Sequence, residues 1–205
     1  MALGVLAGCG SDGTPSGPPD PLAAVPDFIY VSNAGGSNRL YIWSDGVSTL
    51  FPASAAGDAE PQSAAGKVVW TSHRISAQSS DIYVAARDGS NPIRLTSDSN
   101  LGSQPSLSPD GSTIVYTRLH SSISRIWSMS SDGSNPIELS TGSSEDLSES
   151  NPRFSPAGDR VLFSSPRTNT TQIFIVPASG GQAMQVTHEA NGAFDGSWSA
   201  DGNSI

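Results

Sequence analysis

The sequence has little charge and almost no lysine, which limits the kinds of protein it can be. Charged residues make up 14% of the 205 residues, and Lys67 is the only lysine. Long helices favour Ala, Leu, Glu and Lys, so this composition argues against a helical protein. The formal net charge of −9 repels phosphate backbones and argues against a nucleic-acid partner. No apolar run reaches the roughly 20 residues of a transmembrane helix.

Gly, Ser, Pro, Asn and Thr are abundant instead, with 21 glycines and 15 prolines. Many short strands joined by tight turns are typical of this mixture. A chain of this length is long enough for one substantial core, which buries about two-thirds of the unfolded surface. The composition therefore predicts an all-β fold.

Three sequence markers recur in a fixed order. The glycines of four SxxG turns lie 45, 47 and 44 residues apart: Gly66, Gly111, Gly158 and Gly202. The aromatic residues of a second marker lie 42, 44 and 47 residues apart: Tyr41, Tyr83, Trp127 and Phe174. A short apolar segment such as IRLT, at 93–96, closes each unit. The regular spacing indicates a repeated structural unit.

Each unit predicts four short antiparallel strands. Second strands such as TIVY, at 113–116, are apolar at consecutive positions, so both of their faces should be buried. Asp-Gly and Ala-Gly turns supply the positive φ of tight hairpins, and Gly111 is expected to adopt it. A four-stranded antiparallel unit of about 40 to 50 residues, covered by neighbours on both faces, is a blade of a β-propeller.

The markers divide the chain into a leader at 1–9, a Gly/Pro/Ser-rich linker at 10–24 and a propeller at 25–205. We expect blades at 25–58, 59–102, 103–149 and 150–193, and the start of a further blade at 194–205. Residues 28–32 align with second strands, so the first blade lacks an innermost strand of its own.

The repeat, PxxSPDGxxIxY followed by xIYVxxxDGSxxxxLT, resembles that of TolB-type propellers. The resemblance covers 25–205 and is strongest at 106–140. It implies a six-bladed ring, so we expect a chain truncated at both ends, with further blades beyond Ile205; a closed four-bladed ring is the alternative. TolB-type proteins carry an α/β domain before the propeller. This chain has only the linker there, so a role in the Tol–Pal system is not predicted.

The single cysteine, Cys9, cannot form an internal disulfide. Together with the preceding Leu-Ala-Gly it resembles a bacterial lipobox, after which the cysteine is lipidated and becomes the mature N-terminus. The apolar stretch before it is shorter than the roughly seven residues of a signal, so we expect the true start upstream. Gly10 replaces the Asp that favours inner-membrane retention in diderm bacteria. We therefore predict a lipid-anchored protein of the cell envelope, located at the outer membrane in diderms. It would touch the membrane only through this anchor. A lone cysteine in an unstructured leader is the alternative.

No residue pattern indicates catalysis, a metal ion or a cofactor. A GxSxG nucleophile elbow is absent, and His73, His120 and His188 occupy different positions in their repeats. The DGSNP segments at 88–92 and 132–136 lack the spaced acids of a calcium loop and are interpreted as turns. We therefore predict no catalytic residue, no metal site and no cofactor.

One set of polar residues is a candidate binding site. A polar residue precedes each innermost strand, shifted by one place in the second blade: Glu60, Gln104, Asn151 and Asp195. Loops that enter innermost strands converge on one mouth of the central channel, where these side chains would form a polar, partly anionic ring. Binding residues collect on loops held by rigid scaffolds. The alternative is that these side chains only satisfy strand ends and channel water.

Two functions follow from these observations. The first is a non-catalytic envelope lipoprotein whose propeller binds another envelope protein, a peptide or a glycan. The second is the propeller portion of a prolyl-oligopeptidase-type serine peptidase or another exported hydrolase, since such peptidases carry a similar propeller before their catalytic domain. Fold alone does not distinguish the two. Two further blades and a stop codon beyond Ile205 would support the scaffold, and a GxSxG followed by Asp and His would support the peptidase.

Overall fold

A computed structural model of the chain describes residues 27–76, 78–97, 101–141 and 147–205. Within these ranges the regular structure consists of strands, so the all-β prediction is confirmed. No helix in this part of the chain has the length and apolar character needed to cross a membrane. The expected leader and linker, including Cys9, lie outside the described residues.

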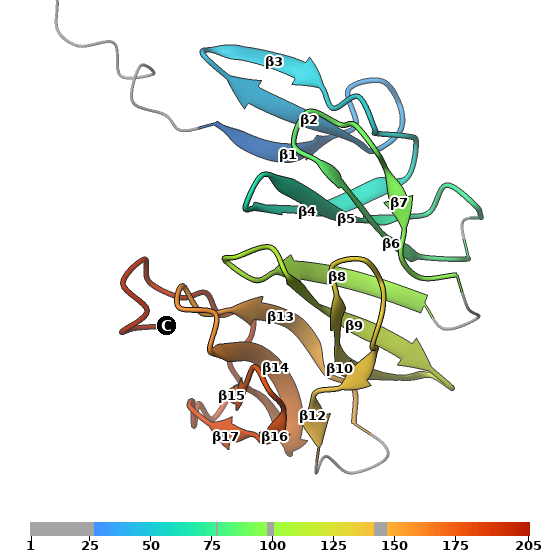
Figure 1. The fold of residues 1–205 in the computed structure, drawn as a ribbon. Helices are drawn as coiled ribbons and strands as arrows, with labels where there is room; N and C mark the ends of the chain where they lie inside the picture. Colours follow the sequence, from blue (N-terminus) through green and yellow to red (C-terminus); the bar gives the residue numbers. More distant parts are fainter. Residues whose placement is uncertain (1–26, 77, 98–100, 142–146) are drawn as a thin grey trace, which may run out of the picture.

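The strands form the blades expected from the repeat: three antiparallel sheets of four strands and one of three (Figure 1). Blade one holds β1 (Phe28–Ser32), β2 (Arg39–Ser44) and β3 (Val47–Leu50). Blade two holds β4 (Asp58–Ala64), β5 (Lys67–Ser72), β6 (Asp81–Ala86) and β7 (Ile93–Arg94). Blade three holds β8 (Leu101–Leu107), β9 (Thr113–His120), β10 (Ile123–Ser130) and β11 (Ile137–Glu138). Blade four holds β13 (Ser150–Phe154), β14 (Arg160–Thr168), β15 (Thr170–Pro177) and β17 (Met184–Gln185).

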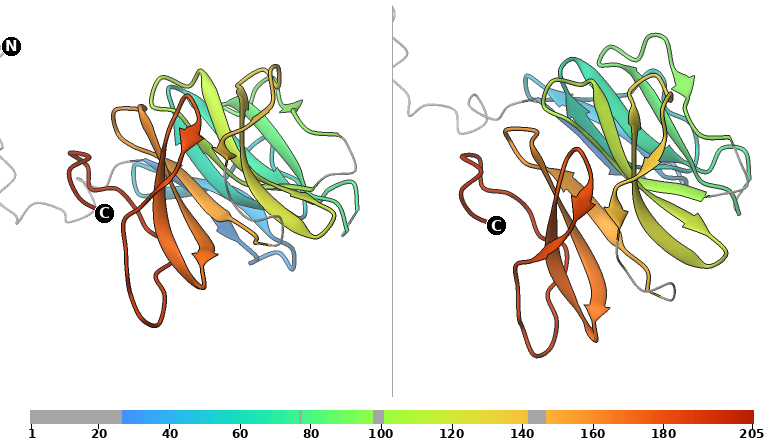
Figure 2. Two further views of the ribbon diagram at one scale, coloured as in Figure 1. Left: turned by 90° about the horizontal axis from the view of Figure 1, so that it is seen from below. Right: turned by 60° about the horizontal axis from the view of Figure 1, so that its bottom comes forward.

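The blades follow one another in chain order as a fan (Figures 1 and 2). In the last three blades the strands are hydrogen-bonded in sequence order, so β4, β8 and β13 each lie at the inner edge of a sheet. β4 contacts β8, and β8 contacts β13. A short parallel pair, β12 (Ser140–Thr141) with β16 (Gly181–Gln182), adds a link between blades three and four. The inner strands therefore lie together, and loops that enter them share one end of the assembly.

Apolar side chains fill each interface between consecutive blades. Val68 and Trp70 of β5 face blade one and pack near Phe51, while Val69 faces blade three and packs near Ile114. All three β5 residues are at most 1% exposed. The prediction that second strands are buried on both faces is therefore confirmed, and it explains why these strands do not alternate between apolar and polar residues.

The repeated SPDG segment is a hairpin turn closed by its own side chains. The Asp110 carboxylate accepts hydrogen bonds from Ser108 Oγ at 2.6 Å and from the backbone N–H of Ser112 at 3.0 Å. These bonds lower the pKa of Asp110 to about 2. Gly111 follows with a φ of +69°, and the other three marker glycines have φ values between +71° and +75°. Blades two, three and four and the segment at 194–205 therefore repeat a turn with the same left-handed glycine.

The only lysine joins two blades. Lys67 Nζ donates hydrogen bonds to the Gly111 carbonyl at 2.9 Å and to Ser131 Oγ at 2.7 Å, both on blade three. Lys67 is the first residue of β5 in blade two. Its ammonium group therefore joins the start of this strand to two turns of blade three.

The segment at 194–205, expected to begin a further blade, forms no strand in the structure. It keeps the turn: Ser199 Oγ donates to Asp201 at 2.6 Å, and Gly202 has a φ of +71°. Gly196 packs against Leu162 on blade four. A strand requires a hydrogen-bonded neighbour, and no described strand pairs with this segment.

Candidate binding site at the inner edge of the blades

The four candidate residues share one unusual backbone conformation. All lie in the left-handed region, with nearly identical φ values: Glu60 (+53°), Gln104 (+53°), Asn151 (+55°) and Asp195 (+56°). This region is uncommon for residues other than glycine, and holding such a residue there costs about 1–3 kcal/mol. We call these four residues the inner belt. Their common conformation shows that they are equivalent positions, including Glu60, which the sequence placed one residue out of phase.

A β-bulge produces this conformation in the three inner strands. The ladder register shifts between Ala59 and Gln62 in β4, and at the corresponding places in β8 and β13. Each bulge contains the belt residue and the proline that follows it: Pro61, Pro105 and Pro152. Proline has no N–H to donate to a ladder, so it fits a bulge at little cost. The bulge turns the belt side chain along the sheet edge toward the next blade.

Hydrogen bonds connect the inner belt from blade to blade. Glu60 Oε2 accepts the backbone N–H of Gln104 at 2.8 Å. Gln104 Oε1 in turn accepts the backbone N–H of Asn151 at 3.0 Å. The last link differs, because Asn151 donates through Nδ2 to the Asp195 carboxylate. The structure thus brings together all four residues that the sequence singled out.

A hydroxyl group on each second strand supports the belt. Thr71 Oγ1 donates to Glu60 at 2.7 Å, and Thr117 Oγ1 donates to Gln104 at 2.9 Å. In blade four, Ser164 Oγ accepts the backbone N–H of Asp195 at 3.3 Å. The belt side chains are therefore held in place before any ligand arrives, which lowers the entropic cost of binding.

A second polar layer lines a cavity of about 290 Å³ next to the belt. It consists of the residues two places after each belt residue: Gln62, Ser106, Arg153 and Ser197. Burial lowers the pKa of Arg153, and the carboxylates of Glu60 and Asp195 oppose this shift. Arg153 thus adds a cation beside the inner belt, which contains two exposed carboxylates. The site therefore offers both hydrogen-bond donors and acceptors.

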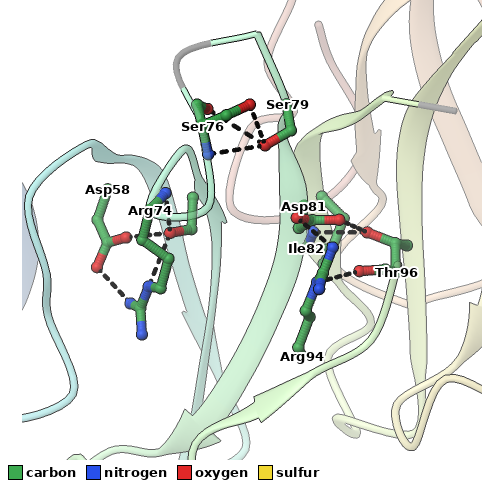
Figure 3. A network of polar contacts seen from close by, with 9 residues as sticks. Asp58, Arg74, Ser76, Ser79, Asp81, Ile82, Arg94 and Thr96 are labelled. Carbon is green, nitrogen blue, oxygen red and sulfur yellow. Dashed lines mark hydrogen bonds and ion pairs between the residues drawn. The ribbon is translucent and has the colours of Figure 1, made fainter. Parts of the chain in front are cut away.

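Blade two contains a buried acid–arginine pair that sequence reasoning missed. Its acid, Asp58, lies two residues before the belt residue Glu60. The Asp58 side chain is fully buried and lies 2.8 Å from Arg74 Nη2 (Figure 3). The Arg74 guanidinium lies 4.4 Å from the ring centre of Tyr83 and 5.8 Å from that of Trp70. The guanidinium thus closes the end of the aromatic core with a neutralised charge.

Blade four repeats this device. Glu149 is fully buried and paired with Arg167, whose guanidinium lies 4.9 Å from Phe174 and 5.3 Å from Phe163. Both acids precede a belt residue by two places. This common offset was the sequence signal that could have identified them as equivalent residues. The Asp81–Arg94 pair, at 2.9 Å, is a different arrangement on the outer strands of blade two (Figure 3).

Two of the three histidines can be placed from their contacts and exposure. The Nδ1 atom of His73 lies 3.1 Å from the Gly57 carbonyl, and His188 is exposed. Among the residues that the structure describes, no group of three or more His, Cys, Asp or Glu side chains could hold a metal ion.

The fold is similar to that of several solved propellers. A scan of protein-family models and a search of curated proteins gave no match. TolB from Acinetobacter baumannii superposes with a TM-score of 0.70 and 22% identity, over 86% of this chain. The chain has a TolB-like β-propeller fold. It spans 45% of the length of that TolB chain.

Two other propellers come from proteins of different kinds. A chain of the nidogen/laminin complex superposes with a TM-score of 0.58 and 13% identity, over 82% of this chain and 65% of the other. Puromycin hydrolase superposes with a TM-score of 0.57 and 20% identity, over 80% of this chain and 31% of the other. Chains of similar fold thus occur in a protein complex and in a hydrolase.

Proposed function

We propose that this TolB-like propeller is a non-catalytic binding platform of the bacterial cell envelope that holds a peptide segment of a partner protein at the inner belt. The observation that carries the proposal is the repetition of one strained, non-glycine conformation at four equivalent positions. Strained residues of this kind collect at ligand clamps and active sites. Similarity to a propeller from the nidogen/laminin complex supports a protein partner.

The chemistry of the belt favours a peptide with basic side chains. Glu60 and Asp195 are exposed, so their carboxylates are accessible to cationic groups and to N–H donors. Arg153 in the second layer can donate to a carbonyl or carboxylate of the same ligand. Because the belt is already held by Thr71 and its counterparts, the partner needs little rearrangement of the propeller.

Removing the charge of the belt should weaken binding while leaving its hydrogen bonds in place. Gln104 shows that a glutamine at this position makes the same bonds as Glu60. We expect the double variant Glu60→Gln with Asp195→Asn to bind lysine- or arginine-containing peptides more weakly, with a dissociation constant raised about tenfold or more. The reason is that charge-assisted hydrogen bonds are roughly twice as strong as neutral ones. A peptide array followed by fluorescence polarisation would measure the effect.

Glu189→Gln is the control, since this exposed carboxylate lies outside the belt. If the double variant and Glu189→Gln bind the same peptides with the affinity of the original protein, the belt is not the binding site.

The proposed envelope location depends on Cys9 and on the TolB-like fold. If Cys9 is lipidated, the full-length precursor should partition into membranes and incorporate labelled fatty acid. Cys9→Ser should release the protein into the soluble fraction, because a lipid chain gains about 0.8 kcal/mol per buried CH₂ from the membrane. Equal partitioning of the two forms would exclude the anchor.

A hydrolase is the second candidate, because puromycin hydrolase contains a similar propeller. Turnover of chromogenic peptides by the complete gene product, with loss of activity after treatment with a serine-directed inhibitor, would support it over the binding platform.

A further inference from the structure

Blade four carries an arginine at a position where the other blades carry neutral residues. This position lies two places after each belt residue and holds, in chain order, Gln62, Ser106, Arg153 and Ser197. The first three are equivalent in the sheets, because each opposes the third residue of the adjacent second strand. The repeated architecture itself therefore does not require a charge here, which indicates a local role for Arg153.

Arg153 is the one charged residue among those that line the cavity of about 290 Å³ beside the belt. Leu107, Phe154 and Trp198 provide the larger apolar parts of the wall. Trp198 is held in place, since its Nε1 donates to the Arg153 carbonyl at 3.2 Å. The volume is close to the lower end of the roughly 300–1,000 Å³ range of small-molecule sites. The cavity therefore suits a small group such as the last residue of a peptide.

The Arg153 guanidinium has no carboxylate partner of its own. Its Nη1 donates to the Pro152 carbonyl at 2.9 Å, and it forms no ion pair with any residue that the structure describes. The carboxylate of Glu60 instead accepts from the Gln104 backbone, and that of Asp195 accepts from Asn151. Arginine stays protonated in proteins. A half-buried guanidinium without an ion-pair partner favours an anionic group that enters the cavity.

The order of the charges gives a bound peptide a direction. The exposed carboxylates of the belt attract cationic groups, whereas Arg153 presents donors inside the cavity next to it. A peptide with a basic side chain and a free carboxyl end matches this order, with the carboxylate inside. Capture of a C-terminal carboxylate is a recurring way of recognising peptides.

We propose that a peptide bound at the inner belt ends in this cavity, with its C-terminal carboxylate on the Arg153 guanidinium and its last side chain against Phe154 and Trp198. The planar guanidinium can form two parallel hydrogen bonds with a carboxylate. This inference rests on the proposed function of the belt and specifies the partner as a protein with a free C-terminal segment.

Pairs of synthetic peptides test the inference. Lysine-containing hexapeptides are made both as free acids and as C-terminal amides, and fluorescence polarisation measures their affinities. We expect the free acids to bind about tenfold or more tightly than their amides, because a hydrogen bond between two charged groups is stronger than one to a neutral group. Arg153→Gln should bind both forms alike. Arg153→Lys, which keeps the charge but loses the planar fork, should retain part of the difference.

Arg87→Gln is the matched control, because it removes the same charge from an exposed arginine that pairs with Asp27. It should keep the full difference between acids and amides. Equal affinities of acids and amides for the original protein, or an undiminished difference in Arg153→Gln, would overturn the inference and leave the belt as a peptide site. So would glutamate-containing amides that bind as tightly as the free acids, because Arg153 would then recognise a side chain. If no peptide binds in either form, the proposed function itself fails. Thermal unfolding of each variant confirms that the fold is retained.

Discussion

Replacing Asp58 with alanine should destabilise the protein by about 3–5 kcal/mol, because one partner of a buried ion pair is removed and the other is left behind. The Asp58 carboxylate accepts the backbone N–H of Ala55 at 2.7 Å and lies 2.8 Å from Arg74 Nη2. Without it, the Arg74 guanidinium would lie against Tyr83 with no buried carboxylate to neutralise it. Urea denaturation monitored by tryptophan fluorescence measures the change in unfolding free energy.

Asp27→Ala is the matched control, because Asp27 pairs with Arg87 at 3.4 Å where both side chains are more than 40% exposed. Exposed pairs contribute about 0–1 kcal/mol, so this variant should stay close to the original stability. The double variant Asp58→Ala with Arg74→Met should recover part of the loss. Equal costs for Asp58→Ala and Asp27→Ala would mean that the buried pair does not stabilise blade two.

Gly111→Val should cost about 2–4 kcal/mol, because left-handed strain adds to overpacking. The φ of +69° disfavours any side chain with a Cβ atom. A Cβ atom at this position would also lie 2.7 Å from the Cβ atom of Ala65 on the neighbouring blade. Thermal unfolding should therefore show a clear drop in melting temperature.

Gly46→Val separates the two contributions. Gly46 also follows an aspartate and has a φ of +78°, but a Cβ atom there would meet nothing within 4 Å. Its replacement should cost only the backbone strain, about 1–2 kcal/mol. If the two valine variants are equally stable, the close approach of Gly111 to Ala65 does not matter.

The blades could be predicted from the sequence because their markers are local. A tight hairpin needs glycine at Gly111, and a strand covered on both faces needs the consecutive apolar residues around Ile114. Each requirement is met within a few residues and then repeated. The same regularity located the four belt residues, although the left-handed backbone of Glu60 and Gln104 could not be read from residue types that normally avoid it. The prolines that follow them were the only local sign of the bulge.

The partners of the charged residues could not be assigned from the sequence because they depend on the register of adjacent strands and on packing between blades. Asp58 and Arg74 meet across two strands, and the burial of Asp58 depends on packing between blades. The opposition of Arg118 and Arg125 depends on the hairpin at Ser121 and Ser122, both of which have positive φ. A hairpin longer by one residue would have placed the two arginines on opposite faces.

The bonding of the inner belt has a consequence for how such chains change during evolution. In its first two links, the donor is a backbone N–H, which every non-proline residue provides, and the acceptor is either a glutamate or a glutamine. A duplicated blade inserted between β7 and β8 would find an acceptor on Glu60 and would present its own acceptor to Gln104. Gene duplication and deletion in units of one blade therefore conserve these links even when the outer strands diverge.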